Sequence, residues 1–318
     1  YNYLKMRESF INYPKIDITQ FKVKSTMGKG AYGTVYKVVN KKNPNEIYAA
    51  KKIKNESKDD ERRMYQYIFG IKREIDTMIS GNNPTLLQFK GLSLTDFSGE
   101  NNIIVFTNFA SKGSLTNICF QSNDSIPNYD NTARQIILVG ISYGMMVLYK
   151  NMMIHRDFKP DNVLLDKDLH PMIGDFGFSK MRPKPTTEDS LYNAPEINSG
   201  ESPTFKSDVY SFAIIAYEII RFDQLPIQIS EIQEESNKSF FEHCLSKNPS
   251  ERPTFDEICR FIIKKKFIKL FDKIEYNLLS QFLDQFEDDQ EVIYLHGLLA
   301  SEIDRKRSAL YFKKAADN

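Results

Sequence analysis

The stretch HRDFKPDN, from His155 to Asn162, decides the fold. It brings an aspartate, a lysine and an asparagine (Asp157, Lys159 and Asn162) onto one short loop. The nearly apolar run IILVGISYGMMVLY, residues 136–149, precedes it and predicts a helix that is buried on most sides. The loop that follows this helix is therefore a candidate for the part of the chain that carries the chemistry.

Two further segments flank this loop. Downstream, GDFGFSK places Asp175 after a short apolar stretch and before Gly177, a residue that permits a sharp turn. Upstream, IYAAKKI places Lys51 on a predicted strand, and IKREIDTM places Glu74 on an amphipathic helix, where it could pair with that lysine. Taken alone, an exposed lysine on a strand and a solvated glutamate on a helix are ordinary surface residues.

The stretch MGKGAYGTVYKV, residues 27–38, has the G-x-G-x-x-G spacing of a phosphate-binding loop. A dinucleotide fingerprint of this kind opens a helix. Here the last glycine leads into residues 34–39, which are β-branched and aromatic, and the preceding FKVKSTM alternates like a strand. The pattern predicts a strand–turn–strand hairpin and disfavours a dinucleotide-dependent oxidoreductase.

In this order, the segments resemble the eukaryotic protein kinase superfamily over roughly Phe21 to Lys265. SKGSL and ERPTF look most like the tyrosine-kinase-like group of serine/threonine kinases. The resemblance implies an α+β bilobal fold, with a small antiparallel β lobe plus one helix and a large, mainly helical lobe, joined near residues 109–113. It also implies a serine/threonine kinase in signalling that uses ATP and Mg²⁺ and acts on protein substrates.

The resemblance implies a role for each matching residue. Lys51 would hold the α- and β-phosphates and Glu74 would position it. Asp157 would accept or orient the proton of the substrate hydroxyl, Lys159 would contact the γ-phosphate, and Asn162 and Asp175 would coordinate Mg²⁺. The implied ATP-binding residues are Met27, Gly28, Lys29, Gly30, Ala31, Tyr32, Gly33, Val35, Ala49, Lys51, Thr107, Asn108 and Ala110.

Other matching positions imply structural roles and control. Asp208 would brace the catalytic loop, and Arg252 would pair with Glu196. Thr186, Thr187 and Ser190 lie on a segment where a phosphate could be anchored by Arg156, although ordinary loop hydroxyls are the alternative.

The chain also departs from the family pattern in three places. Glu188-Asp189 stands where a Gly-Thr pair is usual, which makes substrate positioning less certain. The interval from Glu218 to Cys244 is too short for the usual additional helix of the large lobe. Tyr210 replaces a frequent tryptophan, with Ala213 nearby.

The composition restricts the remaining possibilities. The 43 basic and 42 acidic residues leave a net charge of +1, so charge favours neither nucleic acid nor a membrane as partner. The start of the chain lacks an initiating Met and a signal-peptide core, which predicts a cytoplasmic protein cut from a longer chain. The three cysteines (Cys119, Cys244 and Cys259) are scattered, which predicts reduced structural thiols.

The final segment EVIYLHGLLASEIDRKRSALYFKKAADN resembles the start of a Sel-like, tetratricopeptide-type repeat, which implies protein partners for this part. Because such repeats need about three stacked copies, either the natural chain continues or this helix pair packs on the kinase. An unrelated amphipathic tail is the alternative. The predicted organisation is an N-terminal extension (1–20), a kinase domain (21–268), a linker (269–290) and a repeat fragment (291–318).

A second class of function remains open besides catalysis. A pseudokinase scaffold would keep the fold, recruit partners through the repeat and transfer nothing. The presence of Lys51, Asp157 and Asp175 favours the active enzyme over the scaffold.

Overall fold

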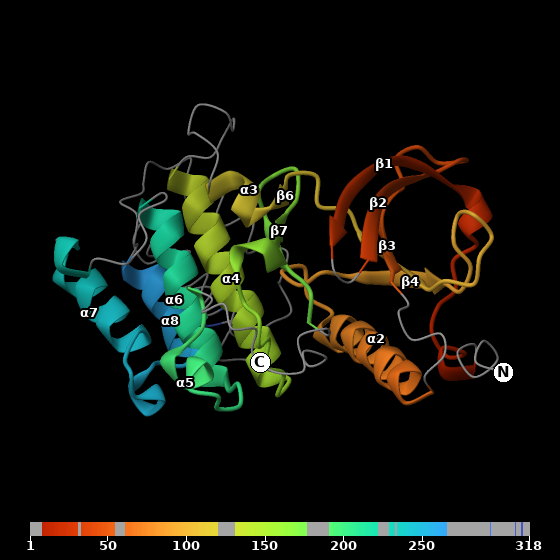
Figure 1. Cartoon of the computed structure of the whole chain (residues 1–318). Coiled ribbons are helices and arrows are strands. Elements are labelled where there is room, and N and C mark those ends of the chain that lie inside the picture. The colour runs from red at the N-terminus through yellow and green to blue at the C-terminus, as the bar shows by residue number, and fades with distance from the viewer. Residues whose placement is uncertain are drawn as a thin grey trace. The chain divides into compact units, whose positions relative to one another are not determined.

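The computed structural model describes residues 8–30, 33–54, 61–119, 131–176, 191–221, 229–232 and 234–265 of the 318-residue chain, with single positions at Ile293, Ala309 and Lys313. The chain divides into two compact units, and each is described by itself (Figure 1). The first comprises Tyr1–Asn82, Leu87–Ser111 and Asp175–Lys184, and the second comprises Asn83–Leu86, Lys112–Gly174 and Pro185–Asn318. The change of unit after Ser111 confirms the predicted junction between residues 109 and 113.

The first unit is built on a five-stranded antiparallel sheet in the order β1-β2-β3-β5-β4. Its strands are β1 (Phe21–Gly30), β2 (Gly33–Asn40), β3 (Ile47–Ile53), β4 (Phe89–Ser93) and β5 (Ile104–Asn108). A short 3-10 turn, η1 (Ile18–Gln20), leads into β1. The predicted hairpin around the glycine-rich stretch is confirmed, because β1 and β2 pair directly and no helix separates them.

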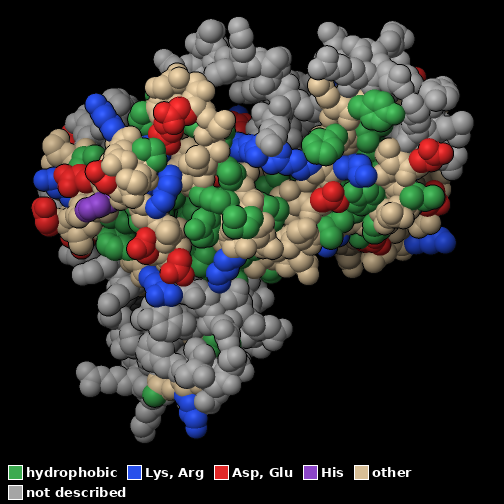
Figure 2. Space-filling model, turned by 90° about the horizontal axis from the view of Figure 1, so that it is seen from below, with side chains coloured by type: hydrophobic (Ala, Val, Ile, Leu, Met, Phe, Trp, Pro, Cys, Tyr) green, Lys and Arg blue, Asp and Glu red, His purple; other side chains and the backbone are tan. Residues whose placement is uncertain are grey.

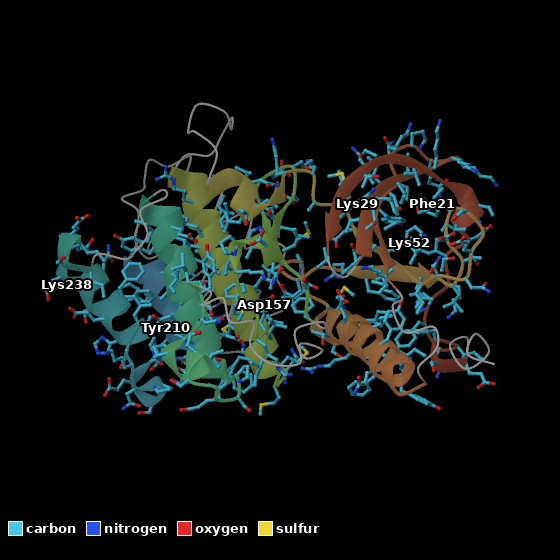
Figure 3. The ribbon with its side chains drawn as sticks, in the orientation of Figure 1. Phe21, Lys29, Lys52, Asp157, Tyr210 and Lys238 are labelled. Carbon is cyan, nitrogen blue, oxygen red and sulfur yellow. The ribbon has the colours of Figure 1, made fainter. Side chains whose placement is uncertain are left out.

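The pairing register separates the two faces of this sheet, because residues paired across antiparallel strands project to the same face. One face forms a core of Phe21, Val38, Ala50, Ile104 and Phe106. Phe21 lies within the curve of the sheet (Figure 3). The residues on the opposite face alternate with these core residues, and they include Lys51.

One long helix, α2 (Glu61–Gly81), lies next to β4 in the first unit (Figure 1). Its apolar residues recur at helical spacing, and Ile68, Ile71, Ile75 and Met78 are buried. The helix ends at Gly81. This element supplies Glu74.

The second unit is mainly helical and carries a small three-stranded sheet in the order β6-β7-β8. The strands are β6 (Gly113–Ser114), β7 (Val163–Leu165) and β8 (Pro171–Ile173). The α-helices are α3 (Leu115–Cys119), α4 (Asn131–Lys150), α5 (Pro195–Asn198), α6 (Phe205–Arg221), α7 (Glu235–Cys244) and α8 (Phe255–Lys265), and 3-10 turns lie at η3 (Pro160–Asn162), η5 (Ile229–Glu231) and η6 (Pro249–Glu251). The predicted α+β architecture is thereby confirmed.

Helix α4 forms the centre of this unit and packs against α6 and α8. Its apolar run is buried, as predicted, and Gln135 donates to the carbonyl oxygen of Ile262 at 3.0 Å. A capping box opens α8, because the Thr254 N–H donates to Glu257 at 2.7 Å and the Glu257 N–H donates to the Thr254 hydroxyl at 3.3 Å.

Several predictions concern parts of the chain outside the described residues. The linker (269–290) and the repeat fragment (291–318) lie there except for three single positions, and so does the segment 177–190 with Thr186, Thr187 and Ser190. Between α6 and α7, the described residues hold only η5, and residues 222–228 and 233 are not described.

The described residues also show how the charged side chains, the cysteines and the apolar helices are distributed. Acidic and basic side chains are interspersed on the face shown in Figure 2. Cys244 and Cys259 are buried, and neither forms a disulfide among the described residues. None of the described helices combines the length and the apolar character that a bilayer-spanning helix needs.

Candidate functional site

Three charged side chains meet in the first unit. The Lys51 ammonium lies 3.1 Å from Glu74 Oε1 and 3.3 Å from Asp175 Oδ1. Strand β3 supplies the lysine, α2 supplies Glu74, and Asp175 comes from a position 124 residues further along the chain. Burial opposes the charge on Lys51, but the two carboxylates outweigh it and raise the pKa of the lysine, so the ammonium stays protonated.

The two carboxylates of this cluster differ in exposure. The Glu74 side chain is 6% exposed and that of Asp175 is 33% exposed. Burial raises the pKa of Glu74, and Lys51 opposes this effect. We take Glu74 as ionised, because an ammonium 3.1 Å away stabilises its negative charge. Asp175 has a φ of 66°, a left-handed conformation that is uncommon for an aspartate and is found repeatedly at functional sites.

The sheet face that carries Lys51 also carries the residues implied to enclose adenine. Val35 pairs with Lys51 across β2 and β3, and Ala49 pairs with Thr107 across β3 and β5. Thr107 is 8% exposed. The Asn108 N–H donates to the carbonyl oxygen of Gln88 at 3.2 Å, which fixes the end of β5. Small and β-branched side chains beside a lysine make an apolar surface with a cation at one end.

The β1–β2 hairpin presents exposed backbone. Lys29 lies near its tip (Figure 3), Met27 precedes it on β1, and a Cβ added at Gly28 or Gly30 would meet no atom within 4 Å. Gly33 is different, because its φ is 149° and a Cβ there would lie 2.1 Å from the carbonyl oxygen of Lys52. Only glycine fits at this position. Ala31 and Tyr32 lie outside the described residues.

The loop after α4 gathers three predicted site residues in the second unit. Lys159 Nζ donates to Asp157 Oδ2 at 2.9 Å, and Asn162 Nδ2 donates to the Asp157 carbonyl oxygen at 2.6 Å. The carbonyl oxygen of Asn162 accepts from the Gly174 N–H at 2.9 Å. The loop is thus held by its own hydrogen bonds, and the Asp157 side chain remains partly exposed, at 29%.

Asp208 braces this loop from α6, which confirms its predicted structural role. Its carboxylate accepts from the backbone N–H groups of His155 at 2.8 Å and Arg156 at 3.0 Å. Burial raises the pKa of Asp208 to about 7, against the effect of these two bonds. The ring of His155 contacts the carbonyl oxygen of Gly174 at 3.1 Å and so ties the loop to the residue before Asp175.

A buried ion pair also lies in the helical unit. Arg252 pairs with Glu196, as predicted, and its guanidinium lies 5.1 Å from the ring centre of Tyr210. The guanidinium thus contacts the aromatic face of Tyr210, the position at which the family resemblance implies a frequent tryptophan.

The predicted site residues fall into two groups. Lys51, Glu74, Asp175 and the implied adenine residues belong to the first unit, whereas Asp157, Lys159 and Asn162 belong to the second. Each group is assembled within its own unit.

Sequence reasoning missed two long-range pairs of tyrosine and carboxylate. The Tyr192 hydroxyl lies 2.8 and 3.0 Å from the two oxygens of Glu218, and Tyr13 bonds to Asp76. No local pattern in the sequence signals either pair.

Comparison with known proteins places these groups in a family context. Residues 21–262 match the family model described as protein kinase domain. A probable leucine-rich-repeat receptor-like serine/threonine-protein kinase of Arabidopsis thaliana is 26% identical over 93% of this chain and 34% of its own length. A receptor-like protein kinase of Ipomoea nil is 33% identical over 62% of this chain and 18% of its own length. A probable serine/threonine-protein kinase of Dictyostelium discoideum is 28% identical over 85% of this chain and 17% of its own length. The chain thus spans about a third or less of each of these relatives.

Proposed function

Because the chain belongs to the protein kinase domain family, we propose that it transfers the γ-phosphate of ATP to serine and threonine hydroxyls of protein substrates. The Lys51–Glu74 ion pair with Asp175 beside it carries this proposal. These residues are the cation and the carboxylates that phosphoryl transfer requires. Two of the three relatives described above are named as serine/threonine kinases, which supports the choice of acceptor.

The residues of the first unit bind and orient ATP in this proposal. Lys51 holds the α- and β-phosphates, and Glu74 keeps the ammonium pointing toward them. Val35 and Ala49 enclose adenine, with Thr107 behind it. The open backbone at Gly28 and Gly30 allows the hairpin to approach the phosphates without a side-chain clash.

The loop of the second unit acts on the acceptor. The oxygen of the substrate hydroxyl attacks the γ-phosphorus while Asp157 accepts the hydroxyl proton. The bond from the phosphorus to the β–γ bridging oxygen breaks, which releases ADP. Lys159 contributes a positive charge toward the transferred phosphoryl group. The hydrogen bonds of Asn162 and Asp208 hold this loop in place before the substrate arrives.

The donor set fits Mg²⁺. The Asp175 carboxylate and the side-chain oxygen of Asn162 are hard oxygen donors of the kind that Mg²⁺ prefers, and they would hold the ion, while the Asn162 amide nitrogen donates to the Asp157 carbonyl oxygen. When bound, the ion would neutralise phosphate charge that develops during transfer.

Turnover by the purified full chain tests this proposal. We expect ADP release and phosphate incorporation into a generic acceptor such as myelin basic protein, in the presence of Mg²⁺, with mainly phosphoserine and phosphothreonine in the product. The Asp157→Asn variant is the matched control, and it should fold but transfer almost nothing. A wild-type chain that binds ATP and transfers none would instead support the scaffold hypothesis.

We further propose that residues 291–318 form the start of a Sel-like repeat that recruits protein partners. The sequence pattern alone supports this part, and it contains no group needed for the chemistry. A chain ending near Lys266 should therefore phosphorylate a small peptide as well as the full chain does. A folded truncated chain without any activity would contradict the proposal.

A further inference from the structure

A short segment before the first strand, Phe10–Ile16, pairs with the sheet, and we call it the N-terminal clasp. Strand β4 is the last strand of the sheet, and the clasp runs along its free edge. The Ile16 N–H donates to the carbonyl oxygen of Leu92 at 2.9 Å, and the Leu92 N–H donates to that of Pro14 at 3.0 Å. The clasp lies outside residues 21–262, which match the family model.

Gly91 makes room for the clasp. This residue has a φ of 151°, and a Cβ there would lie 2.8 Å from the Ile16 side chain and 3.2 Å from the Pro14 carbonyl oxygen. Any other residue at this point would be strained by the positive φ and would crowd the Ile16 side chain. The strand is therefore shaped for this neighbour.

The middle of the clasp reaches α2 through Tyr13. Its hydroxyl donates to Asp76 Oδ1 at 2.6 Å, and its ring packs edge-to-face on Phe89 at 6.4 Å between centroids. Phe10 is fully buried and also packs against the Tyr13 ring, with 5.7 Å between the two ring centroids. Lys15 closes the turn by donating to the carbonyl oxygens of Phe10 and Tyr13.

Asp76 lies two residues after Glu74 on the same helix. At about 100° per residue, the two side chains project to nearly opposite sides of α2. Glu74 is buried and reaches Lys51, whereas Asp76 is exposed and is held by Tyr13. The clasp thus binds the side of α2 that faces away from Glu74. The same segment pairs with the sheet that carries Lys51.

We propose that Tyr13 is a positioning residue that, through Asp76, keeps α2 at the distance from the sheet at which Glu74 pairs with Lys51. This inference rests on the proposed kinase activity for its kinetic readout, although the geometry it describes is a property of the first unit alone. Releasing Tyr13 lets α2 move outward, which separates Glu74 from Lys51 and lowers the rate of transfer.

The Tyr13→Phe variant of the full chain tests the proposal, because it removes the hydroxyl and keeps the ring against Phe10 and Phe89. For an exposed hydrogen bond of this kind, we expect kcat to fall about three- to tenfold and the KM for ATP to change by less than about twofold. The Asp76→Ala variant should show the same loss, and adding it to Tyr13→Phe should cause no further loss. Asp76→Asn keeps an acceptor for Tyr13 and should retain the wild-type rate.

Two controls separate positioning from a general loss of stability. Tyr48→Phe removes a comparable bond, from the Tyr48 hydroxyl on the same sheet to Glu46 at 2.8 Å, whose partner lies two positions away along the chain and not on α2, and should leave kcat unchanged. In a Glu74→Gln background, Tyr13→Phe should have no further effect on kcat, because the residue through which it acts has been removed. A destabilising substitution would lower the rate in either background.

Hydrogen exchange provides a readout that does not depend on activity. Tyr13→Phe should speed exchange of the α2 amides at residues 72–80 by about three- to tenfold and leave the β2 amides unchanged. If the wild-type chain transfers no phosphate, the proposed function fails, and this measurement alone decides whether the clasp holds α2. Unchanged exchange in α2, a wild-type kcat in Tyr13→Phe, or an equal loss in Tyr48→Phe would overturn the proposal.

Discussion

Arg252 holds Glu196 with two parallel hydrogen bonds, from Nη1 to Oε1 at 2.6 Å and from Nη2 to Oε2 at 2.8 Å. The arginine is 1% exposed and the glutamate 8%, so the pair is removed from water. Burial of a charge is tolerated only when its partner stays in place.

The Arg252→Ala variant should therefore lose about 3–5 kcal/mol of unfolding free energy, because it leaves the Glu196 carboxylate buried without its partner. Urea denaturation measures this loss. Arg260 is the matched control, since its contact with Asp256 at 3.3 Å is exposed and its replacement by alanine should cost less than about 0.5 kcal/mol. Equal losses in the two variants would show that burial of the pair is unimportant.

The Asp175→Asn variant should lose Mg²⁺-dependent turnover by at least about 100-fold while the protein remains folded. The carboxylate is a third exposed, so its contact with Lys51 contributes little to stability and the thermal midpoint should stay nearly constant. Asp168→Asn, at an exposed aspartate beside Lys167, is the control and should keep full activity. Turnover within tenfold of wild type would contradict the metal assignment of Asp175.

Glu218 should make stability depend on pH. Burial raises the pKa of its carboxyl from 4.5 to about 7, with the Tyr192 hydrogen bond acting in the opposite direction. Between these two values the native protein binds a proton that the unfolded chain has lost, so the contribution of Glu218 to stability falls as pH rises, by roughly 1–3 kcal/mol in total. Comparing urea unfolding of the wild type and Glu218→Gln at pH 5 and pH 8 isolates this residue.

In that comparison, the stability of the wild type relative to Glu218→Gln should be greater at pH 5 than at pH 8. Other titrating groups are common to both proteins and cancel in the difference. A difference that is the same at the two pH values would mean that the carboxyl titrates normally in the folded protein.

The Thr254→Ala variant should lose about 1 kcal/mol, because it removes the hydroxyl that accepts from the Glu257 N–H at the start of α8. The thermal midpoint measures this loss. Thr254→Ser keeps the hydroxyl and should retain most of the stability that Thr254→Ala loses. If serine does no better than alanine, the cap is not the cause.

The sequence predicted the elements whose signals are local. The glycine-rich hairpin, the amphipathic helix that became α2 and the buried α4 each follow from the spacing of a few neighbouring residues. Arg252 and Glu196 are 56 positions apart, so no local pattern could signal their pairing. This pair was predicted from the family resemblance alone.

Pairs without such a signal were missed. Tyr13 and Asp76 are 63 positions apart, and neither stands in a periodic pattern that points to the other. No local pattern in the sequence signals which unit the residues after α2 join. In the structure, Asn83–Leu86 joins the second unit, where the Ile173 N–H donates to Thr85 at 2.8 Å. Contacts of this kind depend on where distant segments fold, which local propensities do not determine.

The clasp has a practical consequence for where this protein is cut. A fragment that starts at Phe21, where the family match begins, would lose the backbone that covers β4 and would expose a row of N–H and C=O groups along the edge of a sheet. Such an edge pairs readily with the same edge of another molecule. Fragments that start at Phe21 should therefore aggregate during expression. Fragments that start before Phe10 keep the edge of β4 covered and should not associate through it.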